Sequence, residues 1–384
     1  MKILLATSYP VFSGTGGAEK VFWELADHFK KNGNEVACMG FEKGADPAKP
    51  PFFQHDPDLT VSNPGRFYKK SALINLLALF YFFNSELRRK FRDSRESLRK
   101  AYLIKATIDD FKPDLIVSFQ AEMTFVLKHG LRTNIPVITA MHCDIDTLVK
   151  GKQRLFDSLK RSRFIVVLQP SYIKVLASYL CGGNIVWIPN AVPQTEGLCD
   201  SSSHLMLNTG RICPQKNQIF LIKAFAVFKS SHQDWKLKLF GDTNYDASYY
   251  KECCREIDAL GLRDSVEFAG VTSNVMKELE KASIFAFPSV FEGFSLSLTE
   301  AMSQGLPCAC LEKCPGIADL IEDGKNGVLS GDSVDEYAAS LSKLADSIDL
   351  RTTLGNEAKK SMQKYTPSVV WAQWDKLALL ASDS

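Results

Sequence analysis

The sequence contains no apolar run long enough to cross a bilayer. The run SALINLLALFYFF, at residues 71–83, has thirteen residues, whereas a spanning helix needs about 20. The sequence also contains no low-complexity tract and no repeat of solenoid period, which excludes a repeat architecture. The first ten residues, MKILLATSYP, hold one lysine and a very short apolar run before a turn, so we expect a first strand there and no secretory signal.

The cysteines form no framework that indicates disulfides or zinc. Ten are scattered along the chain, and the closest group is Cys308, Cys310 and Cys314. Their spacing, C-x-C-x3-C, matches no usual zinc pattern. We therefore expect thiols buried in the core of a protein in a reducing cytosol, and no metal site.

A dinucleotide fingerprint is also missing. Gly14, Gly16 and Gly17 form a flexible turn after the first apolar run. The pattern G-x-G-x-x-G would need glycine at position 19, where the sequence has Glu19. This disfavours a dehydrogenase, although a glycine-rich turn before a helix can still receive a phosphate.

What the sequence does contain is a regular alternation of strand and helix patterns. With 384 residues, 45% hydrophobic and 23% charged, the chain suits two globular domains of about 150–200 residues. Short apolar strands alternate with amphipathic helices in both halves, which predicts an α/β fold with parallel sheets. The polar stretch TEGLCDSSSH, at residues 195–204, predicts the boundary between the domains.

Charge is divided unevenly between the two halves. The net charge is +2, but residues 1–190 hold 27 basic and 18 acidic side chains, so the second half is acidic. Residues 66–105 alone hold eleven basic and three acidic side chains beside the apolar run. Two interpretations stay open: a core helix followed by a solvated helix, or a surface helix that lies on anionic lipid.

The stretch GRICPQKN predicts a phosphate site at the end of a strand. Arg211 and Lys216 flank its turn, and arginine grips phosphate in a fork while lysine supplies a point charge. Two such cations beside a turn can neutralise a diphosphate leaving group. Taken alone, they are typical of ordinary surface cations.

Two carboxylates in an apolar stretch are the strongest signal from the residues themselves. FPSVFEGFSLSLTEAMSQGLPC carries Glu292 in a turn and Glu300 in the helix that follows. Buried carboxylates are costly unless they are paired or hydrogen-bonded, so we expect a ligand with hydroxyl groups near them. His142 ends another predicted strand, and ligands of α/β sheets bind at such ends, which makes it a further candidate.

These motifs occur together in a known order. GTGGAEKV, His142, IPNAV, GRICPQKN, FPSVFEGFSLSLTEAM and GIADLIEDGKNGVL follow one another as they do in the family-4 retaining glycosyltransferases, which the sequence resembles along nearly its whole length. The resemblance implies the GT-B architecture, with two Rossmann-like, doubly wound domains facing across a cleft. It implies an acceptor-side domain at 1–192, a donor domain at 203–366, and a C-terminal helix at 367–384 that crosses back to the first domain.

The resemblance also implies roles for individual residues. Catalytic roles fall on His142, Arg211, Lys216 and Glu292, with the first near the transferred sugar and the two cations on the donor diphosphate. Donor contacts extend to the sugar, the ribose hydroxyls, the phosphates and the nucleobase, through Gly16, Gly17, Gly210, Gly270, Val271, Gly293, Phe294, Ser295, Leu296 and Glu300. No metal or cofactor is expected, and the Asp-x-Asp spacing of Asp144 and Asp146 is not expected to bind one.

The implied activity is the transfer of a sugar, with retention, from a nucleotide sugar, by family frequency a UDP-sugar. The expected acceptor is a lipid-linked oligosaccharide or a lipopolysaccharide precursor at the cytoplasmic face of a membrane, which residues 66–105 would contact. No nucleic-acid partner is expected. The alternatives are a soluble acceptor, an epimerase or hydrolase of sugar nucleotides on the same fold, and a non-catalytic subunit that binds a nucleotide sugar.

Overall fold

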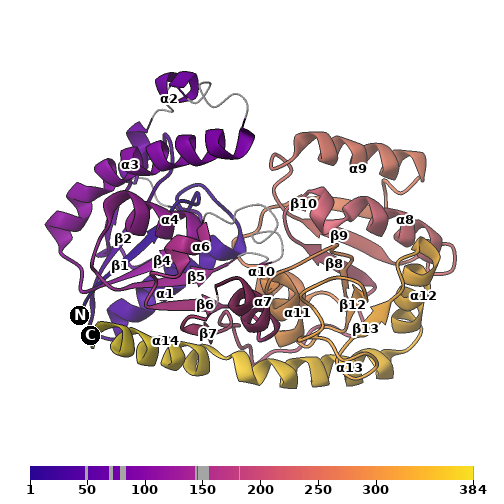
Figure 1. Ribbon diagram of the computed structural model, residues 1–384. Helices are drawn as coiled ribbons and strands as arrows, with labels where there is room; N and C mark the ends of the chain where they lie inside the picture. The colour runs from indigo at the N-terminus through magenta and orange to yellow at the C-terminus, as the bar shows by residue number, and fades with distance from the viewer. Residues whose placement is uncertain are drawn as a thin grey trace. The chain divides into compact units, whose positions relative to one another are not determined.

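The computed structural model describes residues 1–47, 51–68, 72–77, 84–142, 145, 155–180 and 182–383 (Figure 1). Its contacts divide the chain into two compact units. Unit 1 comprises Met1–Pro189 and Trp371–Ser384, and unit 2 comprises Asn190–Val370. The domain ranges 1–192, 203–366 and 367–384 remain sequence-based predictions.

Unit 1 is built on a parallel sheet. Its described residues form seven strands in the order β3-β2-β1-β4-β5-β6-β7. The strands are β1 (Lys2–Thr7), β2 (Glu35–Gly40), β3 (Thr60–Ser62), β4 (Leu115–Phe119), β5 (Val137–Met141), β6 (Phe164–Val167) and β7 (Ile185–Trp187). The order reverses between β1 and β4, and in such sheets ligands bind beyond the carboxyl ends of the strands at that point.

The first helix of unit 1, α1 (Gly17–Lys31), buries the apolar face that its sequence periodicity predicts. The helices of this unit are α1, η1 (Pro64–Phe67), α2 (Ala72–Leu77), α3 (Ser85–Phe111), α4 (Ala121–Phe125), the π-helical η3 (Val126–Leu131), α6 (Phe156–Leu159) and α7 (Ser171–Leu180). In α1, the side chains of Phe22, Leu25 and Phe29 are fully buried. The helix ends where Gly33 takes a left-handed backbone, with φ at +79°.

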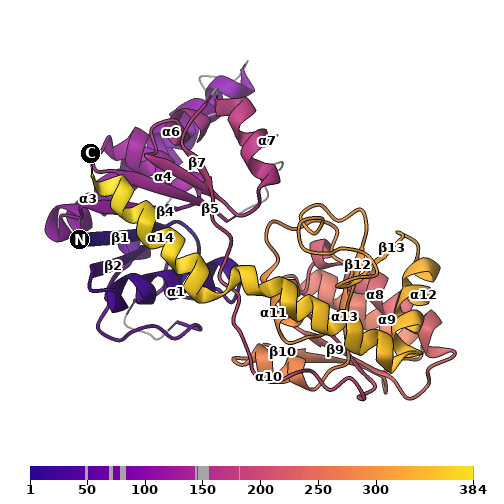
Figure 2. The ribbon, with the colours of Figure 1, turned by 90° about the horizontal axis from the view of Figure 1, so that it is seen from below.

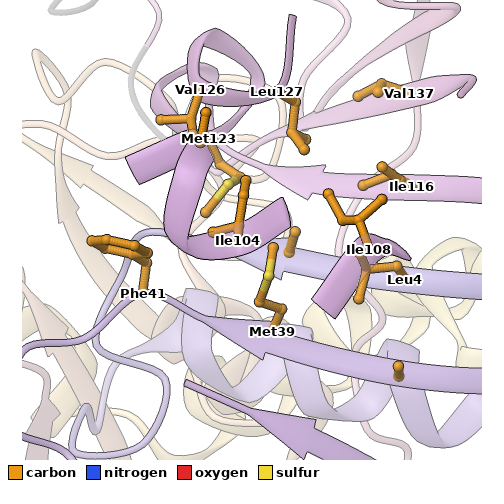
Figure 3. Close-up of a cluster of buried hydrophobic side chains, with 13 residues drawn as sticks. Leu4, Met39, Phe41, Ile104, Ile108, Ile116, Met123, Val126, Leu127 and Val137 are labelled. Carbon is orange, nitrogen blue, oxygen red and sulfur yellow. The ribbon is translucent and has the colours of Figure 1, made fainter. Parts of the chain in front are cut away.

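One core cluster shows how α3 packs on the sheet. Ile104 and Ile108 of α3 lie against Leu4, Met39 and Ile116 of the strands (Figure 3). All five side chains are at least 95% buried. Continuous apolar runs of this kind are typical of parallel strands that are covered on both faces.

Unit 2 repeats the plan with six strands among its residues, in the order β10-β9-β8-β11-β12-β13. The strands are β8 (Leu205–Thr209), β9 (Lys236–Phe240), β10 (Val266–Gly270), β11 (Ile284–Phe287), β12 (Cys308–Leu311) and β13 (Val328–Ser330). The helices are η5 (Pro214–Lys216), α8 (Gln218–Lys229), α9 (Ala247–Ala259), α10 (Val275–Glu280), α11 (Leu296–Ser303), α12 (Val334–Ala345), α13 (Ile348–Ser361) and η6 (Met362–Tyr365). Both sheets are wound in two directions from a central strand, which confirms the predicted Rossmann-like architecture of each unit.

The last helix, α14 (Pro367–Ser382), returns to unit 1 and lies along α1 (Figure 2). Asp375 accepts hydrogen bonds at both carboxylate oxygens, at 2.9 Å from His28 Nε2 and at 2.8 Å from Asn32 Nδ2. The Trp371 ring stacks on His28 with the ring centroids 5.3 Å apart. The chain therefore begins and ends in the same unit.

The structure bears on the core-helix interpretation of residues 66–105 only where it describes the apolar run, at Ala72–Leu77. In this helix, α2, Leu73 and Leu76 are 62% and 60% exposed while Ile74 is buried, so α2 is not a fully buried core helix, and the contact with lipid stays a prediction. Helix α3 buries one stripe and carries basic side chains elsewhere. Within the described ranges, no helix combines the length and the apolar character that crossing a bilayer requires.

The eight cysteines that the structure describes are all free, and seven of them are buried, among them Cys308, Cys310 and Cys314. Burial raises the pKa of Cys314 to about 12, which keeps that thiol protonated at neutral pH.

Candidate functional site

The carboxyl edge of the unit 2 sheet gathers the residues predicted to bind the donor. Gly210 and Arg211 follow β8, Gly270 and Val271 close and follow β10, and Glu292 follows β11. In this sheet β8 pairs with both β9 and β11, and β9 pairs with β10, so these strand ends are neighbours. The predicted residues of unit 2 therefore lie along one edge.

Lys216 and Glu292 form a buried ion pair at this edge. Lys216 Nζ lies 2.7 Å from Glu292 Oε1, and the two residues are 8% and 7% exposed. The ammonium also lies 5.5 Å from the centroid of the Phe287 ring, within range of a cation–π interaction. Glu292 is thus satisfied by a lysine of the same unit, and the net charge of the pair is zero.

The guanidinium of Arg211 adds a positive charge to this edge that the Lys216–Glu292 pair does not neutralise. Its Nη1 donates to the Tyr245 hydroxyl at 2.9 Å, and its Nη2 donates to Gln215 Oε1 at 3.0 Å. The guanidinium carbon lies 5.0 Å from the centroid of the Tyr245 ring. Both partners are neutral, and no carboxylate of the described residues pairs with this guanidinium, so its geometry is fixed while its positive charge stays available to an anion.

Glycines let the backbone close tightly around these groups. A Cβ on Gly241 would lie 2.0 Å from Gly210 O, and one on Gly316 would lie 2.1 Å from Glu292 O. Gly270 holds φ at +73°, and its carbonyl accepts the Gly241 N–H at 2.8 Å. Only glycine can occupy such contacts without displacing the strand ends.

The loop after Glu292 leads directly into α11. Gly293, Phe294 and Ser295 lie between the glutamate and the first helical residue, Leu296, and Ser295 is the N-cap with an extended backbone. Glu300 lies in the second turn of α11 and is 6% exposed, which agrees with the predicted burial of both carboxylates. The loop and the helix together bring these residues to the same strand ends.

In unit 1, the carboxylate of Glu19 lies against the glycine-rich loop. Gly16 is the N-cap of α1, with Gly17 as the first helical residue, and a Cβ on Gly16 would lie 2.5 Å from Glu19 Oε2. The acid lies in the first turn, where it interacts favourably with the helix dipole. An anion that approaches Gly16 therefore meets this carboxylate as well as the helix N-terminus.

His142 directly follows β5, and β4 lies between β5 and β1 in the sheet. Its ring stacks on Phe119 at the end of β4, with centroids 4.7 Å apart and planes inclined by 3°. Both ring nitrogens are buried and have no hydrogen-bond partner among the described residues. Burial lowers the pKa of His142 to about 4, so the ring is neutral at physiological pH and can donate or accept a hydrogen bond.

This pKa predicts a pH dependence of stability. Above pH 6.5 the ring is neutral in both folded and unfolded chains, but between pH 6.5 and 4 only the unfolded chain gains the proton. Unfolding should therefore become easier as the pH falls through this window, by roughly 3 kcal/mol in total. Urea denaturation of the wild type and of His142→Gln at several pH values measures this contribution to the free energy of unfolding. If the free energy of unfolding changed with pH in the same way in the two proteins, the prediction would be contradicted.

Sequence reasoning missed several polar groups at these strand ends. Gln120 follows β4 with a left-handed backbone, φ +82°, and its buried Nε2 has no partner among the described residues. In unit 2, Thr209 at the end of β8 and Ser289 after β11 have buried hydroxyls with no described partner. Buried polar groups of this kind lie elsewhere in the chain as well, for example on α3, but at the strand ends they are placed where a ligand could satisfy them.

Comparison with family models gives two adjoining matches. A model described as Glycosyltransferase Family 4 matches residues 15–196, and a model described as Glycosyl transferases group 1 matches residues 196–361. Together they span all the elements from α1 to α13.

Three relatives show how far the similarity extends. An uncharacterized glycosyltransferase of Haemophilus influenzae is 24% identical over 94% of this chain and 95% of its own length. A Campylobacter jejuni enzyme, GalNAc-alpha-(1->4)-GalNAc-alpha-(1->3)-diNAcBac-PP-undecaprenol alpha-1,4-N-acetyl-D-galactosaminyltransferase, is 23% identical over the same shares of the two chains. An exopolysaccharide phosphotransferase of Streptomyces coelicolor is 31% identical, but the match covers half of this chain and 20% of that protein.

Solved structures share the fold of the whole chain. Sucrose-phosphate synthase from Thermosynechococcus elongatus superposes with a TM-score of 0.79 at 16% identity, over 99% of this chain and 98% of that one. Anabaena HepE, solved in complex with UDP and glucose, gives a TM-score of 0.70 at 19% identity, over 98% and 99%. The fold is therefore that of the GT-B glycosyltransferases.

Proposed function

Because this chain belongs to glycosyltransferase family 4, we propose that it transfers a sugar from a UDP-sugar to a lipid-linked glycan, with retention of the anomeric configuration. The Campylobacter relative is named for an acceptor on an undecaprenyl diphosphate, and HepE was solved with UDP. These names support the donor and acceptor classes, and the site geometry supports the chemistry.

The observation that carries this proposal is the charge arrangement at the carboxyl edge of the unit 2 sheet. Lys216 and Glu292 neutralise each other at 2.7 Å, and Arg211 stands beside them with neutral partners only among the described residues. A donor diphosphate would pair first with Arg211. It would then compete with Glu292 for Lys216, which would release the carboxylate toward the hydroxyls of the sugar.

The reaction needs stabilisation of the leaving group more than it needs a base. The bond between the sugar C1 and the diphosphate oxygen breaks, the acceptor oxygen bonds to C1 on the same face, and the acceptor proton passes to the leaving phosphate. Negative charge grows on the phosphate as this happens, and preorganised cations are effective at that position. In this proposal Arg211 and Lys216 do this work without a metal, and Glu300 accepts hydrogen bonds from the ribose.

A panel of UDP- and GDP-sugars with polyprenyl-diphosphate glycan acceptors tests the function. We expect one UDP-sugar to release UDP only when an acceptor is present, at a rate that EDTA does not change. Release that does not depend on any acceptor would favour the sugar-nucleotide hydrolase and contradict the proposal. NMR of the product tests retention: the transferred sugar should have the same anomeric configuration as it has in the donor.

A lipid-linked acceptor requires that the protein bind a membrane surface. Helices α2 and α3 carry side chains that suit such binding. Leu73, Leu76 and Leu77 of α2 are 62%, 60% and 39% exposed. On α3, Leu98 and Tyr102 are 43% and 81% exposed at a helical spacing of four residues. Exposed apolar side chains among basic neighbours are typical of helices that lie in a lipid interface.

We therefore expect the protein to sediment with vesicles that contain anionic lipid and to be released by salt, since screening weakens surface electrostatics. Leu73→Ser with Leu76→Ser should reduce the bound fraction about tenfold. Leu379→Ser with Leu380→Ser, a pair 56% and 48% exposed on α14, is the matched control. Equal binding of both double variants would remove α2 from the proposal.

A further inference from the structure

A second group of cations lies at the opposite edge of the unit 1 sheet. At the amino ends of β5, β6 and β7 there is a cavity of about 310 Å³. Its polar lining consists of Lys128, Asn134, Arg161, Ser162, Arg163 and Asn184. Strand β5 separates this edge from His142 by five residues, roughly 16 Å, so the cavity is distinct from the candidate active site.

Lys128 is held in place by groups that carry no charge. It is 8% exposed, and its Nζ donates to Thr133 O at 3.2 Å and to Ile135 O at 2.9 Å. Burial and the nearby charge of Arg161 lower its pKa. A buried ammonium is costly unless a negative charge compensates it, and carbonyl oxygens supply only partial charge.

The arginines are arranged around this lysine and not around an acid. Arg161 Nη1 donates to the backbone carbonyl of Lys128 at 3.2 Å, which fixes the Arg161 guanidinium beside the helix that carries the lysine. The guanidinium carbon of Arg163 lies 5.7 Å from the centroid of the Phe164 ring, and Asn184 Nδ2 donates to the Arg163 carbonyl at 3.0 Å. The contacts of the two guanidinium groups are with a carbonyl oxygen and an aromatic ring, neither of which carries a full negative charge.

No counter-ion is present in the part of the chain that the structure describes. No carboxylate there lies within the 4.0 Å that defines an ion pair with Lys128, Arg161 or Arg163, and no acidic residue lines the cavity. Like charges that line one cavity repel one another, so the arrangement is more stable when an anion occupies the cavity.

We propose that this cavity binds a small phosphate-bearing anion. Arginine forks match the oxygens of a phosphate group, the lysine adds a point charge, and the serine and asparagine side chains supply further hydrogen bonds. The volume accepts a phosphate monoester or a pyrophosphate. The site is independent of the sugar-transfer proposal, because none of its residues belongs to the donor site.

Isothermal titration with inorganic pyrophosphate at 150 mM NaCl tests the site directly. Arg161 and Arg163 are exposed, so the double variant Arg161→Gln/Arg163→Gln should stay folded. We expect the cavity of this variant to bind pyrophosphate at least tenfold more weakly than the cavity of the wild type, so that only the donor site still binds it tightly. The matched control, Lys31→Gln/Lys174→Gln, removes two charges from exposed positions of the same unit that do not line the cavity, and should bind like the wild type.

A third variant separates this site from the donor site, which also binds phosphates in the proposed function. Arg211→Gln should leave binding at the cavity intact, so one pyrophosphate should still bind. If Arg211→Gln abolishes all binding, or if the arginine double variant binds like the wild type, the inference is overturned. Binding to vesicles of phosphatidic acid distinguishes the two sources of the anion. If the arginine double variant no longer binds these vesicles, the natural ligand is a lipid headgroup. If it loses pyrophosphate binding but still binds the vesicles, the natural ligand is a soluble phosphate compound.

Discussion

Replacing Lys216 with methionine and Glu292 with glutamine in one protein is expected to give a stable protein that no longer transfers sugar. Lys216→Met alone leaves a buried carboxylate without its ammonium, which should lower the free energy of unfolding by about 3–5 kcal/mol. Adding Glu292→Gln removes the orphaned charge and should restore stability to within about 1 kcal/mol of the wild type. Sugar transfer should fall at least 10²-fold in both proteins, because both lose the lysine cation that stabilises the leaving phosphate.

Urea denaturation and UDP release measure the two effects separately. The exposed pair Lys325 and Glu322 has the same 2.7 Å separation, with side chains 58% and 66% exposed, and provides the control. Lys325→Met should cost less than about 1 kcal/mol and leave transfer unchanged. If Lys216→Met were no less stable than this control, the pair would not be the buried unit described here.

Gly316→Ala is expected to unfold or inactivate the protein by displacing the loop of Glu292. Its φ is +91°, and a Cβ there would lie 2.1 Å from the carbonyl oxygen of Glu292. The backbone is already closed at this point, because Glu292 N donates to Pro315 O at 3.0 Å. We expect a loss of at least about 3 kcal/mol, since a clash with the backbone adds to the strain of the left-handed conformation.

Gly324, eight residues further on, serves as the control, because alanine there would have the backbone strain of a positive φ without a clash. Its φ is +69°, and a Cβ there would have no atom within 4 Å. Gly324→Ala should therefore cost about 1–2 kcal/mol and leave sugar transfer intact. Thermal unfolding with a transfer assay compares the two substitutions, and equal losses would show that contact with Glu292 is not what requires glycine at position 316.

The sequence predicted the alternation of elements because parallel strands and amphipathic helices leave strong local periodicity. Strands β3 and β13 were not predicted: each has only three residues, TVS and VLS, and neither contains the apolar triplet that marks β7, IVW. Helix α13 was also missed: its buried residues include Arg351 and Gly355, which do not mark an apolar face.

The site was predicted less completely than the fold, for a physical reason. Arg211 and Glu292 belong to recognisable motifs, but the residues that they pair with or donate hydrogen bonds to lie far from them in the sequence. Lys216 and Glu292 are 76 residues apart, and Arg211 meets Tyr245 across 34. The ion pair of Glu292 with Lys216 was not predicted, and contact of Glu292 with ligand hydroxyls stays a prediction. Gln120 was missed because a positive φ leaves no pattern in the residues around it.

The return of α14 to unit 1 has a consequence for how the protein is made. A ribosome finishes the first 189 residues of unit 1 long before it reaches Trp371, and all of unit 2 is synthesised in between. During that interval His28 and Asn32 lack the hydrogen bonds that Asp375 makes with them in the folded protein. Unit 1 can therefore complete this surface of α1 only after all of unit 2 has been synthesised.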